Sequence, residues 1–544
     1  MRVKRNARAA IIAAPLALAF LLLDAPHGMA LVINPNFVAP GHVFPGTGIV
    51  ADSAPATVVG GGNIEDVFAA AAQAWERRYD DPHSVTINFG WDNFTFADGV
   101  FSPVHTDPVT GRITEGNIRF TTQLSAFDNW FLDPTPSRNE EYGPPITESA
   151  DLGAGPINTG RFMTAARVPP AIPGVGAHRD LLTNATHEIG HALNINASKL
   201  AAADLGSDGD VDIQHGPFAG TEIPWTSAGG GHPIINPPDG NLLMDGVFLD
   251  GRAHRDQLSD ADVVVTAEVS NFKRVNLDDL SYVAQPDFAD ISNLTLNGDA
   301  AQAGSVLRLT PDEPSKAGSA FLTLPFEFTP RTGFETMFEF AIGGVNDGGP
   351  LGSDGLAFVM HSDPDGASAI GNAGGALGFG IGDSDPLPVD PIAPSIAIEF
   401  DTHQNAFPGR PGSDPDGNHV AFIANGDVSS HGGVASAPFI LNAGTPFFAW
   451  IDFDPIGDIF DLYLSNAMMK PAVPLVSDAL DLFGLLGPEV FFGFTAATGG
   501  GFNTHDILNW DLVIARVPEP GSLVLFAVGL LGLGIAARRR GMVA

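Results

Sequence analysis

Residues 396–420 read IAIEFDTHQNAFPGRPGSDPDGNHV. At the start of this stretch apolar residues alternate with Glu399 and Asp401, a pattern that predicts a strand. Because alternate residues of a strand point the same way, both carboxylates are expected on one face. Two carboxylates on one face of a strand that leads into a Gly- and Pro-rich loop indicate a metal site.

The loop after this strand supplies the remaining candidate ligands. Asn405, Asp414 and His419 follow in order. Oxygen ligands with one imidazole suit a pair of neighbouring hard cations, one calcium and one transition ion such as manganese. An acidic ladder of turns is the alternative, but it does not explain why a histidine closes the run.

Strand-like segments recur on both sides of this stretch, from about residue 283 to residue 515. They include SAFLTLPFEF, TMFEFAIGG and VFFGFTAAT, and turns rich in Gly, Asp and Pro separate them. Short strands at close intervals predict an all-β sandwich for this part of the chain.

This part, 283–515, resembles the L-type (legume) lectins. The segments that carry the resemblance are the metal-loop stretch, DGLAFVMHSDP with Asp354, GGALGFG at 374–380, and FFGFTAATGGGFNTHDILNW. The resemblance implies an all-β lectin sandwich (jelly roll). It implies a transition ion, such as Mn²⁺, on Glu399, Asp401, Asp414 and His419. It implies calcium on Asp401, Asn405, Asp414 and the backbone of His403, and sugar contacts from Asp354, Asn405 and a glycine near Gly375.

A second motif lies in the first half of the chain, where residues 186–195 read THEIGHALNI. Helix residues four apart share a face, so His187 and His191 can reach one zinc ion. Glu188 lies one residue further round, where it can take a proton from a water that zinc activates. Two histidines without a metal on an ordinary helix are the alternative.

Residues 65–265 resemble the metzincin type of zincin metallopeptidase. FAAAAQAWE resembles the first helix of that fold, and NLLMDGVFLDGRAHRDQLSDADV resembles its Met-turn, with Met244 under the metal, followed by a closing helix. The resemblance implies an α+β zincin-like domain over 31–280. We expect a helix over 177–196, with Asn184 as a possible cap.

The metzincin pattern HExxHxxGxxH/D is incomplete, because Asn194 and Ala197 occupy its glycine and third-ligand positions. Two histidines alone would hold zinc weakly, so a later residue has to supply the third bond. His232, in a Gly-rich loop, is the first choice, in an arrangement similar to the leishmanolysin-like metzincins. The alternatives are His215, Asp210 and Glu222.

Both ends of the chain carry expected targeting segments. Residues 1–30 have a basic start, an apolar stretch and a small-residue cleavage site, which predicts a signal peptide. Residues 517–541, VPEPGSLVLFAVGLLGLGIAARRRG, combine Pro-Glu-Pro, an apolar run long enough to reach across a bilayer and three arginines. This transmembrane tail resembles the PEP-CTERM sorting signal of Gram-negative bacteria, which implies processing by an exosortase and a cell-surface or extracellular location.

The composition excludes one class of partner and one way of stabilising the fold. Acidic residues outnumber basic ones by 63 to 26, for a formal net charge of −37, so nucleic acid is not an expected partner. The chain has no cysteine, so its domains depend on core burial and on metal ions instead of disulfides.

The multidomain reading that uses all these features is an exported zinc endopeptidase, acting on protein or peptide substrates, with a calcium-dependent lectin domain that binds carbohydrate or glycoconjugates. A surface adhesin or matrix lectin with a degenerate zincin domain is the second hypothesis. A glycoside hydrolase is weaker, because Glu399 and Asp401 are better explained as metal ligands than as an acid–base pair.

Overall fold

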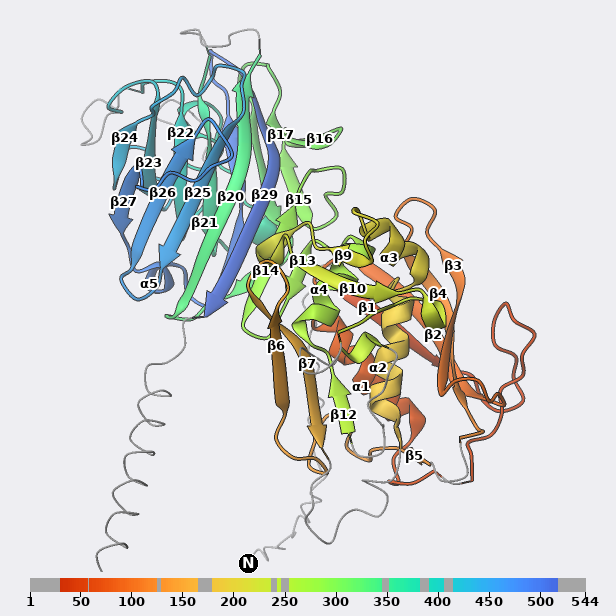
Figure 1. The fold of residues 1–544 in the computed structure, drawn as a ribbon. Coiled ribbons are helices and arrows are strands. Elements are labelled where there is room, and N and C mark those ends of the chain that lie inside the picture. Colours follow the sequence, from red (N-terminus) through yellow and green to blue (C-terminus); the bar gives the residue numbers. More distant parts are fainter. Residues whose placement is uncertain are drawn as a thin grey trace, which may run out of the picture.

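The computed structural model describes residues 30–516 except residue 57 and the segments 125–128, 165–178, 236–241, 246–253, 345–351, 382–390 and 406–413 (Figure 1). The expected tail at 517–541, and the expected signal peptide apart from its last residue, lie outside the described residues. No helix in the described ranges combines the length and the apolar composition needed to cross a membrane.

The first half of the chain is built on a four-stranded mixed sheet. Its strand order is β1 (Leu31–Phe37), β2 (His83–Asp92), β4 (Ile113–Thr121) and β3 (Gly99–Thr106). β1, β2 and β4 run parallel, and β3 is an antiparallel edge strand. Parallel neighbours need a crossover, and helix α1 (Ile64–Glu76) supplies the one between β1 and β2.

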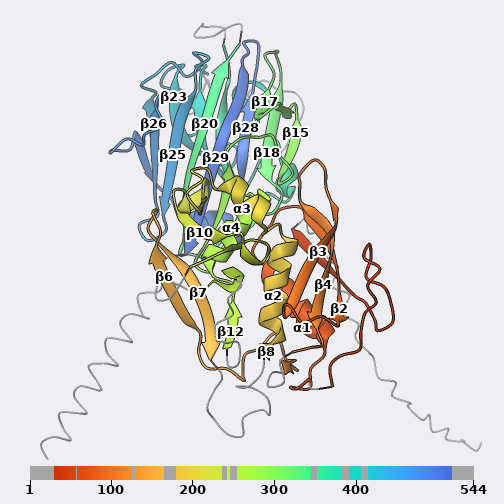
Figure 2. The same cartoon turned by 45° about the vertical axis from the view of Figure 1, so that its right-hand side comes forward.

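Helix α1 forms where the apolar spacing predicts it. Its buried residues include Val67, Phe68 and Trp75, which recur on one face, and the Asn63 side chain caps its first turn by accepting from the Asp66 N–H. Figure 2 shows helix α2 (Leu181–Ala192) between the mixed sheet and strands β6, β7 and β12.

The predicted N-cap of α2, Asn184, is wrong. Asn184 lies inside the helix, and the cap is Asp180, whose carboxylate accepts from the Thr183 N–H at 3.1 Å. The buried Arg255 guanidinium holds that carboxylate with two hydrogen bonds of 2.9 and 3.0 Å. This long-range pairing makes Asp180 the better cap, and local spacing alone does not show it.

Short strands and helices complete this strand-rich half. β5 and β8 form a parallel pair, β6, β7 and β12 form one antiparallel sheet, and β9, β10 and β11 form another. The strands are β5 (Trp130–Phe131), β6 (Ile146–Asp151), β7 (Pro156–Thr164), β8 (Arg179–Asp180), β9 (Asp210–Asp212), β10 (Glu222–Thr226), β11 (His232–Pro233) and β12 (His254–Gln257). The helices and short 3₁₀ turns are α3 (Ala197–Ala203), η1 (Gly216–Phe218), η2 (Ala228–Gly230), η3 (Leu243–Asp245) and α4 (Asp260–Ser270).

The second half is an all-β sandwich, as predicted. One antiparallel sheet contains β13 (Arg274–Asn276), β14 (Leu280–Gln285), β29 (Thr504–Arg516), β20 (Thr332–Gly343), β25 (Phe447–Asp454), β26 (Ile459–Ser465) and β27 (Val476–Ala479), with β17 (Val306–Thr310) paired to β29 and β16 (Ala301–Ala303) paired to β17. The other contains β15 (Leu294–Gly298), β18 (Ala317–Leu322), β28 (Glu489–Ala497), β21 (Gly355–His361), β22 (Ser395–Asp401), β23 (His419–Ala424) and β24 (Val434–Ser436), with β19 (Phe326–Glu327) beside β28. Turns η4 (Gly366–Ser368) and η5 (Gly374–Ala376) and helix α5 (Leu482–Leu486) lie in its connections.

Aromatic rings fill the space between the two sheets. Phe338 stacks on Phe358 at 5.7 Å and meets Phe494 edge-on at 5.0 Å, and Phe494 in turn contacts Trp510 at 5.0 Å. All four side chains are buried. Pairs of this geometry add about 0.5–1.5 kcal/mol each to the burial of apolar area, so the core is held without disulfides.

The two halves share one sheet. β14 pairs with the C-terminal half of β29, from Leu280 opposite Ala515 to Gln285 opposite Trp510. The buried Arg274 of β13 donates to the carbonyl oxygens of Leu324 at 2.5 Å and Pro325 at 2.7 Å. Continuous backbone pairing and this guanidinium therefore join the N-terminal half to the sandwich.

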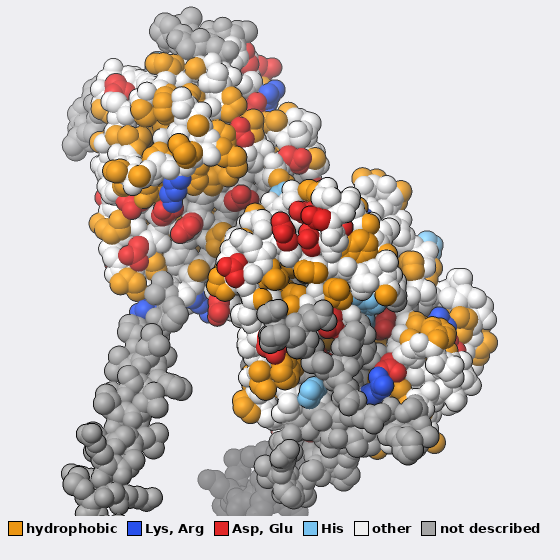
Figure 3. All heavy atoms as spheres, viewed as in Figure 1, with side chains coloured by type: hydrophobic (Ala, Val, Ile, Leu, Met, Phe, Trp, Pro, Cys, Tyr) orange, Lys and Arg blue, Asp and Glu red, His pale blue; other side chains and the backbone are white. Residues whose placement is uncertain are grey.

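Acidic side chains prevail over Lys and Arg on the face of the molecule seen in Figure 3. This distribution agrees with the excess of 63 acidic over 26 basic residues in the sequence.

Replacing Arg274 with Met should lower the free energy of unfolding by about 2–4 kcal/mol, because two carbonyl oxygens and the Asp80 carboxylate lose a buried donor. Urea unfolding of the full-length chain measures the loss. Arg516→Met is the matched control, since its ion pair with Glu327 is exposed and should contribute less than about 1 kcal/mol. Equal losses in the two variants would contradict the assigned role of Arg274.

Candidate metal centres

Three histidines from two distant segments meet in the N-terminal half. His187 and His191 lie on α2, and His232 begins β11. Their ring centroids are 5.0, 5.3 and 4.9 Å apart, and one nitrogen from each lies within 4.8 Å of the others. The structure therefore brings together the three residues that the sequence analysis placed first as zinc ligands.

Each ring is oriented by a backbone carbonyl at its Nδ1 atom. His187 contacts the oxygen of Leu243 at 2.9 Å, His191 that of Ile195 at 2.6 Å, and His232 that of Ala228 at 3.1 Å. An Nδ1–H that donates to a carbonyl leaves Nε2 as the atom with a free lone pair. This is the usual way in which a protein prepares imidazoles for a metal ion.

The Nε2 atoms of His191 and His232 lie 3.2 Å apart. Two nitrogens about 2.0–2.1 Å from a tetrahedral zinc ion would be about 3.3 Å apart, so the spacing fits a shared ion. Burial lowers the pKa of all three rings, that of His191 to about 4. The rings are therefore neutral near pH 7, the form that binds metal.

The loop with His232 passes directly over the position where the metzincin pattern would place its third ligand. A Cβ atom on Gly231 would lie 2.1 Å from the backbone nitrogen of Ala197, and the φ angle of Gly231 is +103°. Only glycine fits such a close approach in this backbone conformation. The close packing brings His232, 41 residues after His191, to the place where the metzincin pattern has a residue six positions after its second histidine.

Met244 lies beneath α2 in turn η3. A Cβ atom on Gly190 would be 2.4 Å from the Met244 sulfur, so the glycine between the two helix histidines makes room for this turn. The buried Asp262 carboxylate holds the turn by accepting from the N–H groups of Leu243 and Met244 at 3.2 and 3.0 Å. The same turn provides the carbonyl that orients His187.

Glu188 is buried beside these histidines, next to Gly99 of edge strand β3, where an added Cβ would come within 2.7 Å of its carboxylate. Burial, with a smaller contribution from the charge of Asp98, raises its pKa to about 8. A carboxyl group with a raised pKa in this position is suited to accept and return a proton.

The alternative third ligands lie elsewhere. His215 contacts Glu268 at 3.6 Å, and Asp210 and Glu222 lie on the paired strands β9 and β10, with Glu222 exposed. Among the described residues, neither carboxylate nor His215 belongs to a cluster of metal-ligating atoms.

A second cluster lies at one end of the sandwich. Glu399 and Asp401 are buried on β22, and the Nε2 atom of His419 at the start of β23 lies 3.2 Å from a Glu399 oxygen. Asp414 accepts from the Asn405 N–H at 2.5 Å, and Asp401 accepts from the His403 N–H at 2.6 Å. The strand and the loop thus bring the expected ligands to one place, although 406–413 lies outside the described residues.

Burial and the neighbouring charges of Glu399 and Asp414 raise the pKa of Asp401 well above its ordinary value. Three carboxylates so close together repel one another, and cations would relieve this repulsion. The donor set therefore fits hard cations.

The expected sugar contacts lie beside this cluster. An added Cβ on Gly375 would come within 2.5 Å of the Asn405 amide nitrogen, and one on Gly499 within 2.9 Å of an Asp354 oxygen. The buried Asp354 has one carboxylate oxygen without a hydrogen-bond partner, and its burial raises its pKa to about 6. The structure thus brings Asp354, Gly375 and Asn405 near one another, as the resemblance implies.

The sequence analysis missed His431. This side chain follows β23, and its Nε2 atom is 3.2 Å from Glu399 and 3.6 Å from Asp414. The only local signal is a histidine followed by two glycines, and no spacing rule links it to His419.

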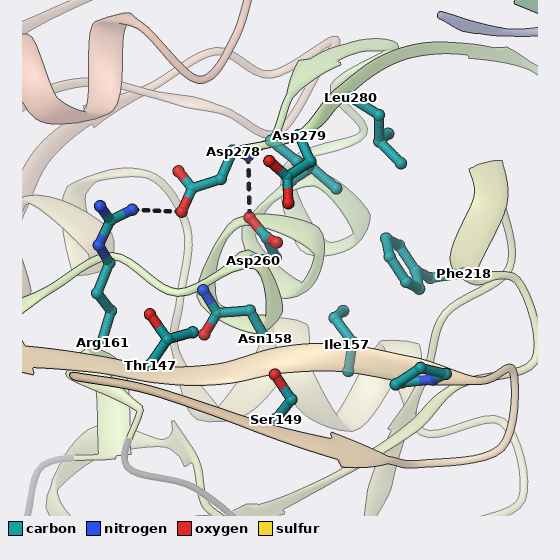
Figure 4. A pocket seen from close by; sticks show the side chains of 12 residues that line it. Thr147, Ser149, Ile157, Asn158, Arg161, Phe218, Asp260, Asp278, Asp279 and Leu280 are labelled. Atoms are coloured by element: carbon teal, nitrogen blue, oxygen red, sulfur yellow. Dashed lines mark hydrogen bonds and ion pairs between the residues drawn. The ribbon is translucent and has the colours of Figure 1, made fainter. Parts of the chain in front are cut away.

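A cavity of about 600 Å³, lined by residues between Thr147 and Leu280, lies apart from both clusters (Figure 4). Arg161 donates to the Asp278 carboxylate at this cavity, and the Asp278 N–H donates to the Asp260 carboxylate at 3.3 Å. Burial and the charge of Asp278 raise the pKa of Asp260 to about 6. None of the expected metal or sugar ligands lines this cavity.

Two antiparallel sheets with a carboxylate-rich loop next to a glycine loop are the arrangement expected of a lectin-type sandwich. Residues 283–522 match the model of the legume lectin domain, and residues 516–540 match the PEP-CTERM protein-sorting motif. The second half is thus similar to a legume lectin domain, and the end of the chain to a PEP-CTERM sorting motif. Both matched ranges begin after the histidine cluster of the N-terminal half.

Curated relatives share the lectin part. The L-type lectin-domain containing receptor kinase VIII.1 of Arabidopsis thaliana is 34% identical over 231 residues, which cover 41% of this chain and 30% of that protein. The receptor kinase S.7 of Oryza sativa subsp. japonica is 30% identical over 266 residues, 46% of this chain and 35% of that protein. The chain spans about a third of the length of these relatives.

Solved lectins are also similar. The lectin from Bauhinia forficata in complex with GalNAc is 23% identical, with a TM-score of 0.35, over 44% of this chain and 99% of its own. Basic winged bean lectin with Tn-antigen is 28% identical, with a TM-score of 0.33, over 42% of this chain and 94% of its own.

Replacing His232 with Ala should lower the transition-metal content of the zinc-loaded full-length chain by one equivalent, because two imidazoles alone hold zinc weakly. Elemental analysis after gel filtration measures this content. His215→Ala is the control and should retain the full content, since His215 lies outside the cluster. The reverse pattern would show that His215, not His232, is the third ligand.

Proposed function

We propose that this protein is an exported zinc-dependent endopeptidase whose calcium-dependent lectin domain holds it close to glycans. The observation that carries the peptidase part is the convergence of three neutral imidazoles, two of them buried and that of His191 half-buried, beside the buried Glu188 carboxyl group. The proposed N-terminal fold is zincin-like, with a mixed sheet, the helix α2 that bears HExxH, and the Met244 turn below it.

The residues present fit zinc, because nitrogen ligands at this spacing match its tetrahedral preference. A zinc ion held here supplies the Lewis acidity that makes water a nucleophile at neutral pH. His187, His191 and His232 position that ion through their Nε2 atoms, and their Nδ1 atoms are fixed by backbone carbonyls.

Glu188 is the proposed general base. Its carboxylate takes a proton from the attacking water and returns it to the leaving amine of the cleaved peptide. Its raised pKa brings proton affinity close to neutral pH in the metal-free protein. Strand β3 beside Glu188 is an antiparallel edge strand, the kind of edge along which an extended peptide can pair.

The lectin domain is proposed to bind calcium through Asp401, Asn405, Asp414 and the His403 backbone, and a transition ion beside it. The Asp354 carboxylate and the Asn405 amide would then form hydrogen bonds with sugar hydroxyls, since calcium fixes the position of the amide. β14 pairs with the far half of β29, whereas the sugar region lies where β28 ends at Ala497. A bound glycan would therefore leave the histidine cluster accessible.

The PEP-CTERM motif supports export, exosortase processing of the tail and a cell-surface or extracellular location. Attachment to glycans there would raise the local concentration of substrate. A second candidate is a carbohydrate-binding adhesin or matrix lectin with an inactive N-terminal domain, and the observation that favours it is that the matched domain model covers the lectin part.

Replacing Glu188 with Gln should reduce cleavage of an unfolded protein substrate by at least about 100-fold, the contribution of a positioned general base. Zinc content should not change, because Glu188 is not a ligand. The measurement is the cleavage rate of the zinc- and calcium-loaded full-length chain, and Glu65→Gln, on the exposed face of α1, is the matched control. No cleavage by the folded, zinc-loaded wild type would favour the adhesin.

Replacing Asp354 with Asn should weaken glycan binding at least about tenfold, because hydrogen bonds to a charged acceptor contribute about 1.5–3 kcal/mol. Binding to a glycan array, with calcium or with a chelator, measures the effect. Asp365→Asn, in an exposed turn, is the control. Calcium-independent binding that survives Asp354→Asn would contradict the proposed sugar site.

A further inference from the structure

His431 reaches the metal loop through the hairpin between β23 and β24. His419 pairs with Ser436, and the chain closes the hairpin with hydrogen bonds from Phe422 N–H to Gly433 O at 3.0 Å and from Gly432 N–H to Phe422 O at 2.8 Å. The segment just after His431 therefore runs back along the strand that His419 begins, which brings the two rings to 5.6 Å between centroids.

Neighbouring strands fix the base of this hairpin. The Gly433 N–H donates to the Asp478 carboxylate at 2.9 Å, and a Cβ atom on Gly432 would lie 2.0 Å from the same carboxylate. The His431 ring is also hydrogen-bonded to the backbone of Val428. These contacts hold His431 in place without help from the metal loop.

The Nε2 atom of His431 points into the cluster of carboxylates. It lies 3.2 Å from a Glu399 oxygen and 3.6 Å from an Asp414 oxygen, and the side chain is only 6% exposed. Of these two oxygens, only that of Glu399 is within hydrogen-bonding distance, and the contact is an ion pair without well-aligned hydrogen-bond geometry. A metal ion bound by both groups would account for a short contact of this kind.

The spacing fits ligands of one ion. Atoms about 2.1 Å from a common ion are about 3.0 Å apart at a right angle and about 3.4 Å apart at the tetrahedral angle. The same Glu399 oxygen lies 3.2 Å from the Nε2 atoms of both His419 and His431. Among the described residues, these three side chains form the one metal-ligating cluster of the sandwich.

We propose that His431 is a direct ligand of the transition ion in the lectin domain, so that this position carries two imidazoles and selects zinc over manganese. The inference rests on the proposed metal loop and adds a ligand to it. Imidazole suits zinc, copper and nickel, whereas manganese prefers carboxylate and water oxygens. A second nitrogen donor therefore moves the preference of the site away from manganese.

The test compares zinc with manganese in the full-length chain. His187→Ala and His191→Ala are introduced first, so that the N-terminal cluster does not take up zinc. The protein is equilibrated with equal, limiting amounts of Zn²⁺ and Mn²⁺ in the presence of calcium, and the bound metals are measured by elemental analysis. Zinc should exceed manganese.

In this background His431→Ser should lower the ratio of bound zinc to manganese at least about tenfold, because even the loss of an outer partner of a metal ligand costs 10–100-fold in affinity. His42→Ser, an exposed histidine in the other half, is the matched control and should leave the ratio unchanged. A ratio that His431→Ser does not change would overturn the proposal.

Electron paramagnetic resonance of bound Cu²⁺ gives a second readout. The nitrogen splitting should indicate two imidazoles in the His187→Ala, His191→Ala chain and one after His431→Ser, or after His431→Asn if the serine variant does not fold. A single imidazole in both would overturn the proposal. Because neither readout involves sugar, a failure here is distinct from a failure of the Asp354→Asn glycan test.

Discussion

Buried ionisable side chains of the same kind, packed against one another, are the constraint on which both candidate centres depend. In the N-terminal half three imidazoles face one another as neutral rings, and burial lowers the pKa of each. In the sandwich the crowded groups are acids instead of bases, because Glu399, Asp401 and Asp414 bring three carboxylates together, and the pKa of Asp401 is raised. A bound cation would stabilise both arrangements, and a chain without cysteine has no disulfide to hold them.

The two centres are held by different kinds of structure. The histidine cluster depends on one buried carboxylate, Asp262, which fixes the Met244 turn and through it the carbonyl that orients His187. The sandwich cluster depends on strand register, since Asp401 on β22 lies opposite His419 on β23. The shared sheet at β14 and β29 connects the two halves while leaving the sugar region at another end.

The parts of the fold that could be predicted from sequence are those with a local period. Short strand-like segments predict the sandwich, and the alternation of apolar and acidic residues predicts that Glu399 and Asp401 share one face of a strand. Apolar residues at helical spacing predict α1, and the four-residue spacing of His187 and His191 predicts that they share one face of a helix. His232 could be proposed because an incomplete motif needs a third ligand. Its approach over Ala197, which needs Gly231, depends on packing that only the structure shows.

Other features could not be predicted because they depend on distant contacts. Asp180 rather than Asn184 caps α2 because Arg255, from far along the chain, holds its carboxylate. His431 reaches the metal loop through a hairpin whose closure depends on Asp478 and on pairing with β23. The residues next to Asp180 and His431 in the sequence give no indication of these distant partners.

Anomalous diffraction from crystals of the full-length chain grown with zinc and calcium tests most directly whether one protein carries both metal centres. We predict one peak at the zinc edge among the Nε2 atoms of His187, His191 and His232, and a second between Glu399, His419 and His431. Crystals that show all three rings of the first cluster in place, with no zinc among them, would contradict the metallopeptidase proposal and leave a lectin as the function of the chain.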